Sequence, residues 1–172
     1  MKVLIVASAV ITILIPIVVC GQRHASGKSY LSWGRASEGF RLSARTDNRR
    51  VPVGQPIVLH LRIKNVTKKP LWLSGSIPEK DYKIEVRDPD GQPAPLTEMA
   101  ESLLSPETPS VIASKLSAGQ EREYTVTLTN LYRITKSGPY LITASREVST
   151  LGSRGAGTVV SNTIRVIVES GE

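Results

Sequence analysis

The sequence predicts an all-β protein: an antiparallel immunoglobulin-like β-sandwich of seven to eight strands that follows an N-terminal signal peptide. Three observations lead to this prediction. Apolar and polar residues alternate in several short segments, glycines and prolines separate these segments, and almost none of the chain has helical spacing. Short strands separated by turns at intervals of about 10–20 residues indicate an antiparallel sandwich or barrel, and of these two we expect the sandwich.

The N-terminal segment has the pattern of an export signal. Lys2 gives it a positive start, and residues 3–19 form an apolar run without a charge. A positive residue, an apolar run and a small residue in this order are typical of a secretory signal peptide, here with cleavage after Gly21. We therefore expect an exported protein, either periplasmic or extracellular.

Cleavage of the signal peptide, residues 1–21, divides the chain into two further parts. Residues 22–38 are polar and are expected to form a tether, and residues 39–170 are expected to form the immunoglobulin-like domain. Lys2 is the only charged residue that is lost, so the net charge falls from +7 to +6. Cys20 is lost as well, and the mature domain is then stabilised without disulfides.

Two alternatives to cleavage stay open at the N-terminus. Residues 3–19 would form an uncleaved membrane anchor, although about 26 Å of helix is shorter than the ~30 Å hydrocarbon core and Pro16 weakens the helix. Cys20 would be lipidated in a bacterial lipoprotein, but Val19 stands where a small residue is needed. Membrane contact is expected only in these two cases.

The alternating segments predict the strands and the core. The clearest strand is residues 57–64, because apolar residues recur there at every second position. The other strands are expected at residues 40–45, 71–73, 82–87, 111–116, 124–129, 140–144 and 159–168. From their phase we expect these residues in the core: Leu59, Leu61, Ile63, Trp72, Ile84, Val126, Leu128, Ile142 and Val166.

Three local patterns predict further details. The segment Asp88–Gly91 has the proline and glycine of a tight turn. Residues 96–104 are expected to contain a short helix, with Thr97 as its N-cap. Tyr140 stands at the start of a late strand, as in a tyrosine corner, so its hydroxyl should bond the backbone of the preceding crossover.

Several segments resemble recurrent elements of bacterial exported sandwich domains. They are the opening Val53-Gly-Gln-Pro-Ile-Val-Leu-His-Leu-Arg-Ile-Lys-Asn65, the turn Leu116-Ser-Ala-Gly-Gln120, the strand start Ser137-Gly-Pro-Tyr140 and the last strand Ser161-Asn-Thr-Ile-Arg-Val166. Together they resemble the BsuPI-type proteinase inhibitor domain and uncharacterised secreted domains. The resemblance implies the sandwich fold and, as an alternative function, proteinase inhibition. It assigns no inhibitory residue.

The residues that catalysis or metal binding needs are scarce. One Cys and two His exclude a disulfide scaffold, a Cys-based zinc site and an iron–sulfur protein. Nucleophile-elbow, zinc-protease, phosphate-loop and dinucleotide motifs are missing from the sequence. We therefore expect no enzyme, no catalytic residue, no cofactor and no metal. His60 is interpreted as a solvated residue on a polar strand face, and His24 as part of the tether.

Two other patterns have structural interpretations. Asp88, Asp90 and Gly91 resemble the start of a calcium loop, but the twelfth position is Met99 instead of Glu, so the turn is favoured. The triplet Asn65-Val-Thr67 is a formal glycosylation acceptor that matters only in a eukaryotic secretory pathway.

The basic character of the chain bears on its partners. The 22 Lys and Arg residues outnumber the 15 Asp and Glu residues. Many of them, such as Arg49, Lys68 and Arg165, fall in predicted turns or on outward strand positions, where charge keeps sheet edges unpaired. The excess also favours attraction to anionic polymers or lipid headgroups. We expect a protein or an anionic cell-envelope polymer as partner, and no nucleic acid, because aromatic residues are not interleaved with the basic ones.

These observations predict an exported non-enzymatic module that binds a protein or a cell-envelope polymer, or has a structural role. Its alternative is proteinase inhibition. Two segments, Gln92–Leu116 and Ser149–Thr158, are longer than a sandwich needs. Because loops carry most recognition, we expect partner contact at one of them, unless both are tolerated insertions.

The export prediction is tested by N-terminal sequencing of the secreted protein. Its first residue should be Gln22 or lie within a few positions of it, because cleavage is expected after Gly21. Recovery of the full-length chain in the membrane fraction would instead favour the anchor.

Overall fold

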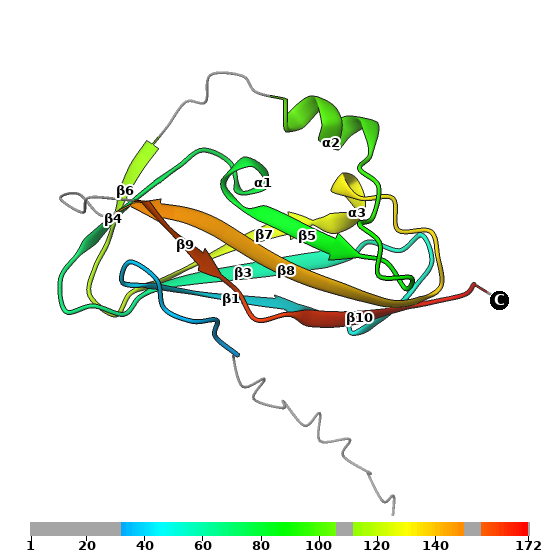
Figure 1. Cartoon of the computed structure of the whole chain (residues 1–172), viewed down its shortest axis with the longest axis horizontal. Coiled ribbons are helices and arrows are strands. Elements are labelled where there is room, and N and C mark those ends of the chain that lie inside the picture. The colour runs from blue at the N-terminus through cyan, green and yellow to red at the C-terminus, as the bar shows by residue number, and fades with distance from the viewer. Residues whose placement is uncertain (1–31, 106–111, 150–155, 172) are drawn as a thin grey trace, which may run out of the picture.

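The computed structural model describes residues 32–105, 112–149 and 156–171 of the chain. This part forms a two-layer β-sandwich with short helices along one side (Figure 1). Its strands are β1 (Phe40–Thr46), β2 (Arg50–Pro52), β3 (Val58–Asn65), β4 (Leu71–Gly75), β5 (Lys83–Arg87), β6 (Ile112–Leu116), β7 (Glu121–Thr127), β8 (Gly138–Ser149), β9 (Ala156–Val160) and β10 (Ile164–Glu169). Its helices are α1 (Pro78–Asp81), α2 (Glu98–Leu103) and α3 (Leu128–Leu131).

The strands form two facing sheets and a separate ribbon. The first sheet has the order β1-β3-β7, the second has the order β2-β10-β8-β5 with β9 also paired to β8, and the ribbon consists of β4 and β6. All described pairs are antiparallel except β2 with β10, which run parallel because the chain crosses between the sheets after β1. A first strand shared between two antiparallel sheets is typical of an immunoglobulin-like sandwich, so the predicted fold class is confirmed.

The described residues contain ten strands, more than the seven to eight predicted. The difference has a simple cause. β2 has only three residues and continues the direction of β1 in the other sheet, and β9 and β10 are two parts of one last strand that a bulge divides. If each of these pairs is counted as one strand, the sandwich has eight.

β3 shows why the alternating pattern predicted the core well. Its residues alternate between buried and half-buried along all eight positions, and Leu59, Leu61 and Ile63 have no exposed surface. β1 and β7 pair with its two edges, so β3 is the central strand of its sheet. Eight of the nine predicted core residues are buried: Leu59, Leu61, Ile63, Ile84, Val126, Leu128, Ile142 and Val166.

The ninth prediction, Trp72, is wrong. Its residue surface is 44% exposed, whereas its neighbour Leu73 is 3% exposed and belongs to the core. β4 pairs only with β6, and Trp72 lies opposite Lys115 on the outer side of this ribbon. The predicted strand 71–73 is too short for alternation to show which of its residues face the core. The large aromatic side chain of Trp72 suggested the wrong face.

The long segment Gln92–Leu116 is partly built into the core. Ala94, Ala100 and Leu116 are buried, and the N-cap prediction is confirmed because Thr97 Oγ1 accepts a hydrogen bond from Ala100 N at 3.1 Å. Exposed apolar residues do occur, since Ile112 is 71% exposed. The segment is therefore a packing element and not merely a tolerated insertion, at least in its described parts.

The tyrosine corner is also confirmed. Tyr140 is 1% exposed, and its hydroxyl accepts a hydrogen bond from the backbone N–H of Lys136 at 3.1 Å. Leu128, predicted as a strand residue, instead begins the one-turn helix α3, which leads into the crossover before β8. The corner fixes where this crossover ends and the central strand of the second sheet begins.

Asn65 connects two turns at one end of the sandwich. It is fully buried, and its side-chain nitrogen donates to the carbonyl oxygens of Lys69, Leu116 and Ser117 at 2.8–3.1 Å. Its side-chain oxygen accepts from the backbone N–H and the hydroxyl of Thr67, both at 2.8 Å. The asparagine of the formal glycosylation triplet is thus enclosed in the folded domain and has a structural role.

A buried charge ties the second sheet to the ribbon. The side chain of Arg146 on β8 is only 2% exposed and lies 3.3 Å from Oδ2 of Asp81. The guanidinium also donates to the carbonyl of Ser74 on β4 and covers the ring of Tyr82, with 4.8 Å between guanidinium carbon and ring centroid. Because a buried guanidinium is costly when it loses its carboxylate, this pair makes the positions of α1 and β4 interdependent.

We expect Leu61→Ala to lower the free energy of unfolding by about 2–5 kcal/mol, because it leaves a cavity at the centre of the sandwich. Arg62→Ala, the neighbouring change on the opposite face, removes only half-exposed ion pairs with Glu121 and Glu123 and should cost less than about 1 kcal/mol. Urea denaturation of both variants measures the difference. Equal losses would contradict the described strand phase.

Candidate functional site

The candidate site forms where β1 faces the bulge between β9 and β10. At this bulge three residues, 161–163, lie opposite only two residues of β8. Ser161 stays attached to β8, because its backbone N–H donates to the carbonyl of Ala144 at 2.8 Å and its hydroxyl accepts from Ala144 N at 3.0 Å. The extra residue frees the side chain of Asn162 to reach the other sheet.

Asn162 joins the two sheets through its side-chain amide. The side-chain oxygen accepts from the backbone N–H of Ala44 at 2.9 Å, and the side-chain nitrogen donates to the backbone carbonyl of Ala44 at 3.0 Å. These are backbone groups at the edge of β1 that faces away from β3. Nearby, Gly34 N donates to the carbonyl of Leu42 at 2.9 Å, so residues before β1 cover the next part of the same edge.

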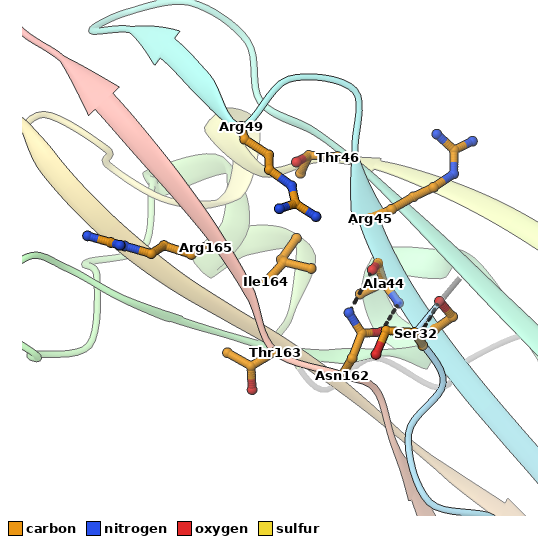
Figure 2. A pocket seen from close by; sticks show the side chains of 10 residues that line it. Ser32, Ala44, Arg45, Thr46, Arg49, Asn162, Thr163, Ile164 and Arg165 are labelled. Carbon is orange, nitrogen blue, oxygen red and sulfur yellow. Dashed lines mark hydrogen bonds between the residues drawn. The ribbon is translucent and has the colours of Figure 1, made fainter. Parts of the chain in front are cut away.

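Beside this bridge lies a cleft of about 320 Å³ between β1 and β10. Its lining consists of Ser32, Ser43, Ala44, Arg45, Thr46, Arg49, Asn162, Thr163, Ile164 and Arg165 (Figure 2). The described residues of this lining include three arginines and several hydroxyl groups, but no carboxylate, histidine or cysteine. The cleft is therefore cationic and polar, with Ile164 as its main apolar contact.

The three arginines differ in what they can do. Figure 2 shows the guanidinium of Arg49 extending into the cleft between Thr46 and Ile164, whereas Arg45 and Arg165 point away from it in different directions. Arg45 is already paired with Glu123 at 2.9 Å and with Asp47 at 3.5 Å. Within the described ranges, neither Arg49 nor Arg165 has a carboxylate within ion-pair distance. Arg49 is thus the cation available to a group that enters the cleft.

The arrangement suits the binding of an anion. A guanidinium offers a planar fork of donors that matches a carboxylate or a phosphate in two parallel hydrogen bonds. The hydroxyl of Thr46 lies beside the guanidinium of Arg49, whereas Thr163 points away from it (Figure 2).

His60 is not the solvated residue that the sequence predicted. Its side chain is only 16% exposed, with Nε2 3.0 Å from Oδ1 of Asp47 and Nδ1 3.2 Å from Oε1 of Glu123. Since β3 is central in its sheet, residues from β7 and from the chain after β1 cover it. Arg62 also pairs with Glu123, at 2.7 Å, and lowers the pKa of that carboxyl. The ring belongs to an ion-pair network and not to the cleft.

The aspartates of the calcium-like pattern hold a lysine. Lys136 Nζ lies 2.7 Å from Asp88 Oδ2 and 2.6 Å from Asp90 Oδ2, and this ammonium lowers the pKa of Asp88. The turn itself is formed as predicted, with Gly91 N donating to the Asp88 carbonyl at 2.9 Å. In the parts of the chain that the structure describes, no three His, Cys, Asp or Glu side chains are placed to share a metal ion.

A second cleft, of about 310 Å³, lies at the edge of β5. Its walls are more apolar, with Leu96, Pro93 and the ring of Tyr132 opposite the strand, and Arg87 stands at its border. Tyr132 donates its hydroxyl to the carbonyl of Ile84, which fixes the ring in this wall. The cleft has less polar lining than the one at Arg49 and no guanidinium without an acceptor, because Arg87 Nη1 donates to the Gly91 carbonyl at 3.1 Å.

The sequence did not predict the cleft at Arg49. The sequence pattern places Arg49 in a turn and Arg165 at an outward strand position, and neither placement brings the two residues to one site. Partner contact was instead expected at Gln92–Leu116 or Ser149–Thr158. Parts of both segments lie outside the described residues, and the contact stays a prediction. The one available signal is Asn162, a polar residue in phase with the buried Val166 and Val168 of the predicted strand 159–168.

Comparison with known proteins adds no assignment of function. No protein family and no curated protein matches the sequence. Three solved structures that are similar to this chain are the C-terminal domain of wzt, a β-glucosidase from Listeria innocua in complex with isofagomine, and the PapD-like domain 7 of human CEP192. The first is 13% identical, with a TM-score of 0.48, and the match covers 81% of this chain and 78% of that one.

The β-glucosidase is 16% identical, with a TM-score of 0.43, and the match covers 88% of this chain but only 20% of the enzyme. The CEP192 domain is 15% identical, with a TM-score of 0.39, and coverage is 75% of this chain and 87% of that one. Similarity at this level carries no argument about activity, and the fold assignment rests on the strand pairing of this chain.

None of the helices in the described ranges has the length and hydrophobicity of a membrane span.

We expect Asn162→Ala to destabilise the domain by at least about 2 kcal/mol. The change leaves the backbone N–H and carbonyl of Ala44 without partners at a part-buried edge, and an unsatisfied group costs about 1–3 kcal/mol. Thr163→Ala removes an exposed side chain next to it, together with one exposed hydroxyl contact to Thr143, and should cost less than about 1 kcal/mol. Thermal and chemical denaturation measure both, and an unchanged Asn162→Ala variant would contradict the role of the bridge.

Proposed function

We propose that this chain is an exported, non-enzymatic binding module that recognises an anionic group of a cell-envelope polymer through the cleft at Arg49. The observation that carries the proposal is the guanidinium of Arg49, which extends into a polar cleft and has no carboxylate partner among the described residues. The pattern of residues 1–21 supports export, and the net positive charge supports an anionic partner.

The lining supports binding as opposed to turnover. A bidentate carboxylate or phosphate on Arg49 would lie against Thr46, whose hydroxyl suits the hydroxyl groups of a sugar or a polyol. The Asn162 bridge fixes the separation of β1 and β10, so the cleft keeps its width without a ligand. A preformed site loses little entropy on binding, which favours a selective contact.

The test is a comparison of Arg49→Gln with Arg41→Gln. Arg41 is an exposed arginine of β1 outside the cleft, so both variants lose one positive charge from the same strand region. Retention on isolated cell-envelope polymers and titration calorimetry should show about 10- to 100-fold weaker binding for Arg49→Gln only, because a charged hydrogen bond contributes about 1.5–3 kcal/mol. Equal loss of affinity in both variants would mean that overall charge, and not a site at Arg49, determines the binding.

The same preparation separates binding from the inhibitor function that the BsuPI-type resemblance implies. We expect no loss of protease activity when the protein is titrated against a panel of serine and cysteine proteases, since no described segment that lines the cleft resembles a reactive loop. Stoichiometric inhibition of any protease that survives Arg49→Gln would favour the inhibitor instead.

A further inference from the structure

The outer face of the second sheet carries a row of exposed residues that begins at the cleft. Arg165 of β10 and Arg87 of β5 both pair in register with Leu141 of β8, so the three residues lie side by side across three strands. Leu141 is 44% exposed, and both arginines are exposed. The row therefore places one exposed apolar side chain between two guanidinium-bearing side chains on the outer face.

The residues next to this row present hydroxyl groups. Tyr140, Ile142 and Ala144 are buried, so the intervening positions Leu141 and Thr143 point outward. Thr143 lies next to Leu141 on this face, and its hydroxyl is 3.0 Å from the hydroxyl of Thr163. The face therefore combines the apolar side chain of Leu141 with the paired hydroxyls of Thr143 and Thr163.

The charges of the face are unevenly paired. Lys83 lies 3.1 Å from Glu85, and Arg50 lies 2.9 Å from Glu169, so these four side chains compensate each other. Within the described residues, no carboxylate lies within ion-pair distance of Arg87 or Arg165. The face also carries the exposed carboxylate of Glu147 on β8. The guanidinium groups without a carboxylate partner are thus located at the two ends of the row, and that of Arg87 also donates to the Gly91 carbonyl.

The row connects the two clefts. Arg165 and Thr163 line the cleft at Arg49, and Figure 2 shows Arg165 pointing out of it, away from Arg49. Arg87, at the other end, borders the second cleft beside β5. Because neighbouring strands are about 4.8 Å apart, the backbones of Arg87 and Arg165 are about 10 Å apart. A ligand longer than one group can follow this path across the strands.

We propose that the ligand is a linear polysaccharide with repeated carboxylate groups, and that it runs from Arg49 across Arg165 and Leu141 to Arg87. This rests on the proposed function and specifies its ligand. Carboxylates spaced along a chain match the separated guanidinium groups, the apolar face of a sugar ring packs on Leu141, and ring hydroxyls reach Thr143 and Thr163. A polymer of phosphates alone would use the arginines but not the leucine.

The test uses a disaccharide and an octasaccharide of a linear polyuronate, with an uncharged glucan octasaccharide as control, in titration calorimetry. The wild-type protein should bind the octasaccharide at least about tenfold more tightly than the disaccharide, since only the longer chain reaches the outer face. Arg87→Gln and Leu141→Ala should remove most of this gain and leave disaccharide binding unchanged. Arg49→Gln should weaken both ligands, and Arg41→Gln should weaken neither.

The outcomes separate the two proposals. Binding of both uronates with equal affinity, dependent on Arg49, overturns the extended path and leaves the anion cleft intact. Failure of either uronate to bind, with retained binding of another anion at Arg49, overturns the polysaccharide only. The last outcome concerns polyphosphate and vesicles of anionic phospholipid. If either binds as tightly as the octasaccharide, and Leu141→Ala has no effect, charge alone determines the contact and the polysaccharide proposal is overturned.

Discussion

The free edge of β1 has backbone N–H and carbonyl groups that need partners, and the side chain of Asn162 supplies two of them. The other sheet provides this side chain only because a bulge adds one residue to the last strand at that point. The bridge sets the distance between β1 and β10, protects the edge from pairing with another chain, and forms one wall of the cleft. The fold and the candidate site therefore depend on the same pair of hydrogen bonds.

The cations of the two outer faces differ in how they are paired. On the β1-β3-β7 sheet, Arg45, Arg62 and Lys64 all pair with Glu121 or Glu123 across the strands, at 2.7–3.4 Å. Such half-exposed pairs contribute little to stability individually. Among the described residues, Arg49 at the cleft and Arg87 and Arg165 on the opposite face have no carboxylate within ion-pair distance. The net charge of the chain does not distinguish these side chains from the paired ones.

Alternation predicted the long strands well because burial repeats every second residue over many positions, as in β3 and β8. It failed for Trp72, where the strand is short. It also did not predict that Arg146 is buried, although Arg146 is in phase with the buried Tyr140, Ile142 and Ala144. The partner of Arg146, Asp81, comes from a distant helix, so no local pattern identifies the pair. The cleft was hidden for a similar reason: Ala44 and Asn162 are 118 positions apart, and only the folded topology brings them together.

The place of β10 affects how the domain folds. β10 lies between β2 and β8, so the second sheet has a gap in its middle until β10 has been synthesised. Without β10 the second sheet is incomplete, and the cleft lacks the wall that Ile164 and Arg165 form. Long-range pairing of this kind folds slowly and leaves strand edges exposed in the meantime. The continuity of the second sheet and the wall of the cleft therefore arise in the same step, when β10 pairs with β2 and β8.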